Sequence, residues 1–197
     1  MVKQEGNAMS KMNFEKFYKA AHNVLRTRKN NNYIFVYPEF IKYFRQLKEI
    51  DKHNFIIGTH FIYGWMPTML TIHQIEEDGV IDHAVTILNE VKHGKEIEMD
   101  ELQYLKKIIN NSIVGPSKLL HFIAPVRYAI WDSKVCHFMY GDKNVKSIER
   151  FFEYTKNVRE IAAEERFKQL YPDICNKIGY EVTPLRAIEW IMWMRGG

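Results

Sequence analysis

Apolar side chains recur at helical spacing along almost the whole chain. Phe14, Phe17, Ala21 and Val24 follow one another at intervals of three, four and three residues, which predicts a helix that begins after Asn13. Similar stripes predict further helices that begin at Pro38, cover 54–66, follow Gly79, follow Asp100, run from about 144 to 170 and follow Thr183.

The one competing strand signal is the run Tyr33–Tyr37, which contains five β-favouring residues. A lone strand has no partner with which to pair, so this run is left as extended or helical. The pattern therefore predicts an all-α fold of about nine or ten helices, compact and built as one or two lobes.

The segment 54–66 differs from the other predicted helices because it is apolar nearly all round. A surface helix carries a single apolar stripe, whereas a helix that is apolar on every side is buried. A helix that spans a bilayer needs about 20 residues, and this segment is shorter. We therefore expect 54–66 to be the buried central helix of the fold.

Composition narrows the class of protein. The 197 residues are 46% hydrophobic and 14% aromatic, which excludes a disordered chain and suffices for one large core. We predict a single all-α domain over 13–197, preceded by a flexible N-terminus over 1–12. The net charge of +4 is compatible with a polyanionic partner without requiring one.

The expected cellular location follows from the apolar runs and the cysteines of the sequence. No run of about 18 apolar residues occurs, so we expect a soluble protein without a membrane partner. Cys136 and Cys175 lie in apolar helical contexts without CxxC spacing, which indicates reduced core residues in a cytoplasmic protein. The oligomeric state stays open.

The sequence motifs of several common nucleotide-binding and metal-binding sites do not occur in this chain. The glycine motifs that hold dinucleotides or nucleoside triphosphates do not occur. The eight histidines form neither HExxH nor HxxxH, so no metal site is predicted. No cofactor is predicted either.

The most informative stretch is 112–135. An apolar run of helical spacing stops at Pro125, and a short crossing leads to Asp132, directly before the new helical pattern of Val135 and Phe138. Aspartate is a favoured N-cap because its carboxylate accepts backbone N–H groups of the first turn. Asp132 is therefore a structural cap, a positioned catalytic acid, or both.

Two segments within 112–135 carry a resemblance to a known protein family. Val114-Gly-Pro-Ser-Lys118-Leu-Leu opens an apolar helix, and Ile130-Trp-Asp132-Ser-Lys-Val135 opens the next. This order resembles the helix-hairpin-helix DNA glycosylases over about residues 100–141. Ile113 stands where the family's hairpin has its first glycine. The Lys-Leu-Leu-His-Phe…Trp-Asp segment is closer still to uncharacterised bacterial proteins, and that similarity brings no function with it.

The resemblance implies a DNA base-excision glycosylase that acts on a flipped base of double-stranded DNA. Asp132 would stabilise the oxocarbenium ion or activate water, and Lys118 would be the nucleophile if the enzyme is also a lyase. The residues expected to contact nucleic acid are Gly115, Ser117, Lys134, Lys143 and Lys146. The residues expected to line the base pocket are Trp131, Tyr128 and His121.

Each residue also has a plainer interpretation. Lys118 can be a solvated lysine near a helix start that Ser117 caps, and Trp131 and His121 can be core side chains. Lys16, Lys19 and their basic neighbours on the first predicted helix can be a solvated face. The alternative function is a non-catalytic helical module that binds nucleic acid or protein with the same fold, and a purely structural role also stays open.

Overall fold

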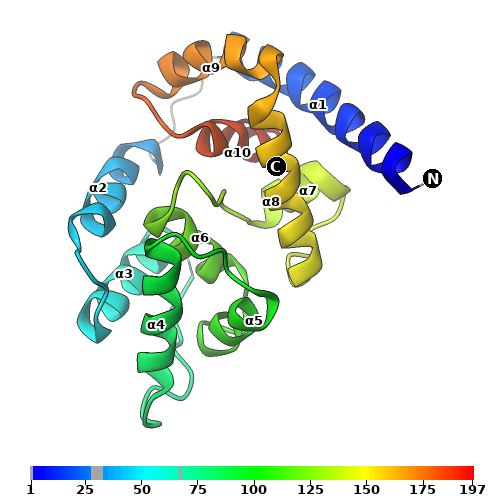
Figure 1. The fold of residues 1–197 in the computed structure, drawn as a ribbon. Coiled ribbons are helices and arrows are strands. Elements are labelled where there is room, and N and C mark those ends of the chain that lie inside the picture. Colours follow the sequence, from blue (N-terminus) through cyan, green and yellow to red (C-terminus); the bar gives the residue numbers. More distant parts are fainter. Residues whose placement is uncertain (1, 28–32, 67) are drawn as a thin grey trace. The chain divides into compact units, whose positions relative to one another are not determined.

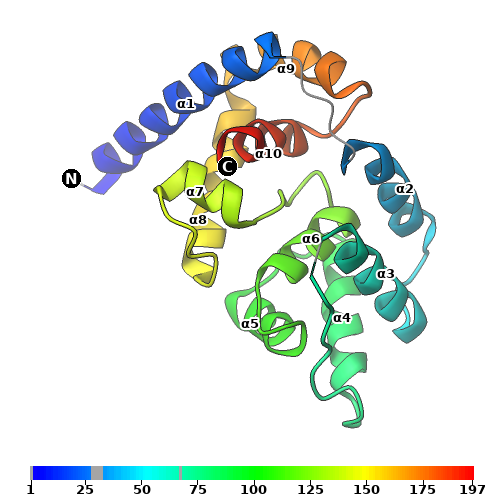
Figure 2. The same ribbon diagram turned by 180° about the vertical axis from the view of Figure 1, so that it is seen from behind.

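The computed structural model describes residues 2–27, 33–66 and 68–197, with side chains described for 14–27, 35–66 and 68–197. This part of the chain contains ten α-helices (Figures 1 and 2). It contains one isolated antiparallel bridge, between Ile72 and Ile109, and no strand. The predicted all-α fold of about ten helices is confirmed.

The helices form two compact units. Unit 1 comprises residues 1–30, 129–145 and 149–197, and unit 2 comprises residues 31–128 and 146–148. Neither unit is one continuous stretch, because the chain passes between them several times. The single domain predicted for 13–197 and the flexibility predicted for 1–12 stay predictions.

Unit 1 holds five helices, of which α8 begins one residue earlier, in unit 2. They are α1 (Val2–Arg26), α7 (Ser133–Tyr140), α8 (Ile148–Ala163), α9 (Glu165–Ile178) and α10 (Pro184–Arg195). Helix α10 packs against α1, α7 and α9. All its residues from Leu185 to Met192 are buried, including the ion pair between Arg186 and Glu189.

Unit 2 holds the other five helices. They are α2 (Tyr33–Gln46), α3 (Lys52–Trp65), α4 (Val80–Lys92), α5 (Met99–Ile108) and α6 (Val114–Ile123). Helix α6 packs against the other four, and every residue from Gly115 to Ile123 is buried.

The central helix of unit 2 is therefore α6, and the prediction that 54–66 is the buried central helix of the fold is wrong. Helix α3 buries Phe55 and Ile62 but leaves Phe61 39% exposed. An all-round apolar sequence shows that a helix can be buried, whereas the number of neighbours that pack around it depends on the whole arrangement. Four helices surround α6, so the side chains on all sides of α6 are buried.

A glycine lets α6 approach α3 closely. A Cβ added at Gly115 would lie 2.5 Å from the hydroxyl oxygen of Tyr63, which is far inside van der Waals contact. The turn that leads from α5 into α6 is made elsewhere, by Asn110 and Asn111 with φ of 56° and 48°. Asparagine tolerates this left-handed region better than most residues.

Some predicted helix starts are wrong. Helix α1 begins at Val2 and runs through Asn13, which is therefore no cap. Helix α2 begins at Tyr33 and contains Pro38, so the run Tyr33–Tyr37 is helical. Helix α5 begins after Glu98, whose backbone N–H donates to the Glu101 carboxylate at 2.9 Å. Asp100 lies in its first turn.

Other boundaries are confirmed or refined. Thr183 caps α10 as predicted, its hydroxyl accepting the N–H of Arg186 at 3.3 Å, with Pro184 in the first turn. The long pattern predicted over 144–170 is two helices, α8 and α9, which separate at Glu164. Among the described residues, no helix has both the length and the apolar character needed to cross a membrane.

Candidate functional site

Asp132 is the N-cap of α7, as the sequence predicts. Its Oδ1 accepts the backbone N–H groups of Lys134 and Val135, both at 2.9 Å. The same helix ends at Gly141, whose φ of 79° is the left-handed conformation that glycine adopts without strain. Asp132 is half-buried, so its carboxylate is partly exposed while two hydrogen bonds hold Oδ1.

Buried rings fix the chain just before this cap. Trp131 donates from Nε1 to the carbonyl of Val145 at 3.1 Å, and its ring centroid lies 5.1 Å from that of Tyr154. Tyr154 in turn donates its hydroxyl to the carbonyl of Ile130 at 2.9 Å. Burial raises the pKa of Tyr154 well above its ordinary value, and the negative charges of Glu189 and Asp132 raise it further. The acid of Asp132 therefore lies near a buried, neutral phenol.

Lys118 lies in unit 2, in the middle of α6. It is only 7% exposed, and its Nζ lies 5.2 Å from the centre of the Trp65 ring. The interpretation as a solvated lysine at a helix start is wrong, because α6 begins four residues earlier, at Val114. Ser117 is no cap either, since its hydroxyl donates to the carbonyl of Val114 at 2.8 Å. Asp132 and Lys118 thus belong to different compact units.

The hairpin residues expected to contact phosphate are buried. Gly115 lies against Tyr63, and the Ser117 side chain is fully buried. Phosphate contact at these two positions would need α6 to present a face that it now turns to its neighbours. Their predicted role in nucleic-acid binding stays a prediction.

Two of the residues expected to line a base pocket, His121 and Tyr128, are core residues of unit 2. His121 makes hydrogen bonds from Nδ1 to the carbonyl of Tyr128 at 2.7 Å and from Nε2 to the hydroxyl of Tyr37 at 2.8 Å. The Tyr128 hydroxyl accepts the N–H of Ile97 at 2.8 Å and donates to Glu96 at 3.1 Å. Burial raises the pKa of Tyr128 to about 12.

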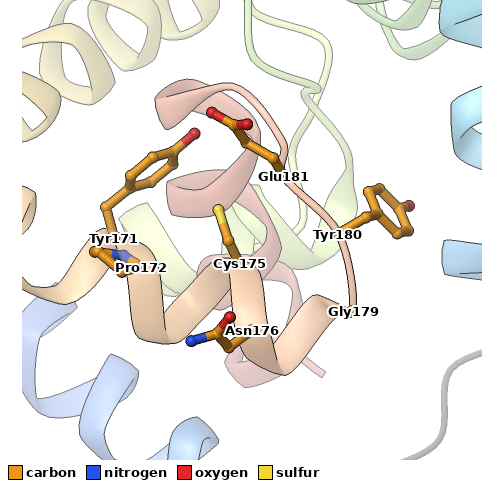
Figure 3. A pocket seen from close by; sticks show the side chains of 7 residues that line it. All are labelled: Tyr171, Pro172, Cys175, Asn176, Gly179, Tyr180 and Glu181. Carbon is orange, nitrogen blue, oxygen red and sulfur yellow. The ribbon is translucent and has the colours of Figure 1, made fainter.

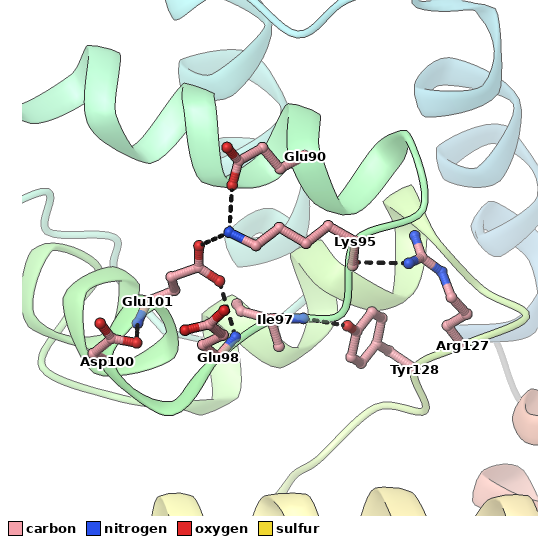
Figure 4. A network of polar contacts seen from close by, with 8 residues as sticks. All are labelled: Glu90, Lys95, Ile97, Glu98, Asp100, Glu101, Arg127 and Tyr128. Carbon is pink, nitrogen blue, oxygen red and sulfur yellow. Dashed lines mark hydrogen bonds and ion pairs between the residues drawn. The ribbon is translucent and has the colours of Figure 1, made fainter.

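Ion pairs hold the loop next to Tyr128 in place (Figure 4). Lys95 Nζ lies 2.8 Å from Glu90 and 2.7 Å from Glu101, and Arg127 donates to the carbonyl of Lys95 at 2.8 Å. With Trp131 also buried, all three residues expected in the base pocket are core side chains, which is the plainer interpretation given for Trp131 and His121. Contact of these rings with a flipped base stays a prediction.

The three lysines expected to contact phosphate have different settings. Lys134 lies with Nζ 4.1 Å from the centre of the Trp193 ring, so α10 holds its side chain. Lys143 is exposed in the loop between α7 and α8. Lys146 is exposed but belongs to unit 2, where its carbonyl accepts the ammonium of Lys106 at 3.1 Å. Lys134 therefore lies in the first turn of α7, two residues after the cap Asp132, and Lys143 lies in the loop that follows this helix.

Unit 1 also has two cavities that the sequence does not predict. The first, of about 330 Å³, is lined by Lys16, Lys19, Ala20, Asn23, His137, Phe138 and Arg195. The only sequence signal is the spacing of Lys16, Lys19 and Asn23 along one face of α1, which by itself indicates a solvated face. The lining residues that come from α7 and α10 lie more than 100 positions after those of α1 in the sequence.

The second cavity lies at the end of α9 and has a volume of about 390 Å³. Tyr171, Cys175 and Glu181 point to the same side there, and Tyr180 points away from them (Figure 3). Cys175 is half-buried, so its predicted place in the core is wrong, whereas Cys136 is buried as predicted. Burial raises the pKa of Cys136 above its ordinary value.

No protein-family model, curated protein or solved structure matches this chain. The function is therefore argued from the residues themselves.

Proposed function

We propose that this protein binds double-stranded DNA and releases a base from it, with Asp132 acting at the sugar of a flipped nucleotide. The observation that carries the proposal is the carboxylate fixed at the start of α7 by two backbone N–H groups. The order of segments over residues 100–141, which resembles the helix-hairpin-helix glycosylases, supports it.

The physical argument concerns the charge that develops during base release. Loss of the base leaves positive charge on the sugar, and a fixed negative charge nearby lowers the energy of that transition state. Two backbone N–H donors hold the carboxylate in place at the N-terminus of α7. Both cap bonds involve Oδ1 of Asp132, so the cap leaves Oδ2 to face a substrate.

We propose that base release proceeds without a covalent Schiff base. Such a step needs the amine of Lys118 at the sugar carbon. Lys118 is only 7% exposed and lies beside Trp65, so its amine is not presented to a substrate. The simplest enzyme consistent with this burial uses Asp132 alone.

A second function, DNA binding without catalysis, is favoured by one observation. Trp131, Tyr128 and His121 are all buried, so none offers an exposed ring face on which a flipped base could stack. A module that kept the helical arrangement and lost the base pocket would have this property.

The test is base release from a panel of duplexes that each carry one damaged or unusual base. Asp132→Asn removes the charge but keeps a good N-cap, so it separates chemistry from folding. We expect release by the unchanged protein, no release by Asp132→Asn and full release by the control Asp173→Asn, which changes an exposed aspartate on α9. Borohydride should trap no protein–DNA adduct.

Two other outcomes decide against parts of the proposal. A trapped adduct that disappears in Lys118→Ala would show that the lysine is the nucleophile after all. Binding of the duplexes without release of any base would leave the non-catalytic module as the function.

A further inference from the structure

We propose that the first cavity of unit 1 binds a phosphate group. We name this cavity the α1–α7–α10 pocket, after the helices that line it: Lys16, Lys19 and Asn23 come from α1, His137 and Phe138 from α7, and Arg195 from α10. None of these residues takes part in the proposed chemistry at Asp132. The inference therefore stands independently of the proposed function.

The positive charge of the side chains that line the pocket identifies its ligand as an anion. Two lysines, one arginine and one histidine line the pocket, and no carboxylate does. All four of these side chains are exposed, so a ligand can reach them. The cavity at the end of α9, which has a similar volume, is lined by one carboxylate and no basic side chain, so basic lining is not general in this unit.

The acidic side chain next to Lys16 on α1 does not cancel this potential. Glu15, the nearest acid along α1, is paired with Arg166, and this pairing holds the pKa of its carboxyl below the ordinary value. Lys16 donates to the backbone carbonyl of Phe138 near the end of α7 and lies 4.7 Å from the centre of the Phe138 ring. A helix C-terminus carries partial negative charge that repels anions, and the Lys16 ammonium offsets it there.

The types of donor favour phosphate among anions. Lys16, Lys19 and Asn23 follow one another along α1 at spacings of three and four residues, so they lie on one helix face. Arg195 adds a planar guanidinium, which matches two phosphate oxygens at once. The volume of about 330 Å³ lies within the range of about 300 to 1,000 Å³ of small-ligand sites.

Two sources can supply such a group. One is the sugar–phosphate backbone of a nucleic acid, and the other is a phosphorylated small molecule. The recognising chemistry is the same in both, so the experiment has one arm for each source.

The experiment uses the full chain, titrated with inorganic phosphate and separately with a fluorescently labelled DNA duplex at several salt concentrations. Lys19→Gln with Arg195→Gln removes two of the pocket's charges and leaves Lys16 on Phe138. The matched control, Lys156→Gln with Lys168→Gln, removes two exposed charges of the same unit outside the pocket, where the side chains are 77% and 57% exposed. Far-ultraviolet circular dichroism confirms that each variant is folded.

We expect the pocket variant to bind inorganic phosphate about tenfold more weakly, because charge-assisted hydrogen bonds are lost. If the source is DNA, the salt dependence of duplex binding should fall by about one unit in slope, because the contact to one backbone phosphate is lost. If duplex binding stays unchanged while phosphate binding weakens, the pocket serves a phosphorylated small molecule.

The proposal fails if the unchanged protein does not bind phosphate, or if the control variant weakens binding as much as the pocket variant. Asp132→Asn should leave phosphate binding intact. Loss of base release in Asp132→Asn and loss of phosphate binding in the pocket variant are therefore separate results, and either proposal can fail alone.

Discussion

The Oδ1 atom of Asp132 and the backbone nitrogen of Val135 lie 2.9 Å apart, and this bond begins helix α7. It links a feature visible in the sequence, an aspartate before a helical pattern, to the residue on which the proposed chemistry depends. A carboxylate with two backbone partners is both a cap and a fixed charge.

Asp132→Ala should lower the free energy of unfolding by about 1 kcal/mol, because two N–H groups of α7 lose their acceptor. Asp132→Asn should cost only a few tenths of a kcal/mol, since asparagine caps nearly as well. Urea unfolding of both variants, with Asp173→Ala at an exposed position of α9 as control, measures the difference. Equal stability of Asp132→Ala and the unchanged protein would contradict the role as a cap.

Gly115→Ala should destabilise the protein by about 1 to 3 kcal/mol, because the new methyl group would overlap Tyr63 and force α6 away from α3. Gly64→Ala is the matched control. Gly64 is also helical, but nothing lies within 4 Å of a Cβ added there. Since alanine favours helices more than glycine does, Gly64→Ala should stabilise by about 0.5 to 1 kcal/mol. Thermal unfolding in which both variants shift the same way would contradict the close approach.

Glu189→Ala should destabilise unit 1 by about 3 to 5 kcal/mol, because it leaves the Arg186 guanidinium buried without this partner. The exposed pair of Lys168 and Glu165 has the same spacing on α9. Glu165→Ala should therefore change stability by less than about 1 kcal/mol. Denaturant unfolding of the two variants tests whether burial accounts for the difference.

The free energy of unfolding should fall as the pH rises above about 10, which is the ordinary pKa of a tyrosine side chain. Burial raises the pKa of Tyr63 to about 12, so between these values the unfolded chain loses a proton that the folded protein keeps. Deprotonation then favours unfolding. Urea unfolding at pH 9 and pH 11 should show a smaller loss for Tyr63→Phe than for the unchanged protein. An equal loss in both proteins would exclude Tyr63 as a contributor.

Local features were predictable because they depend on residues close together in the chain. The apolar stripe Phe14, Phe17, Ala21 and Val24 is buried in α1, as its spacing indicates. The cap at Asp132 needs only the two or three residues that follow it. Helix type and caps follow from such short-range interactions.

What the sequence by itself determined is thus the all-α class, most of the helices and the cap of α7. The tertiary structure decided that α6 rather than α3 is the central helix of unit 2, and that Lys118 is buried against Trp65. It also brought Lys16, His137 and Arg195 to one pocket. These outcomes depend on which helices pack together, and no local spacing of residues encodes the free energy of contacts between segments far apart in the chain.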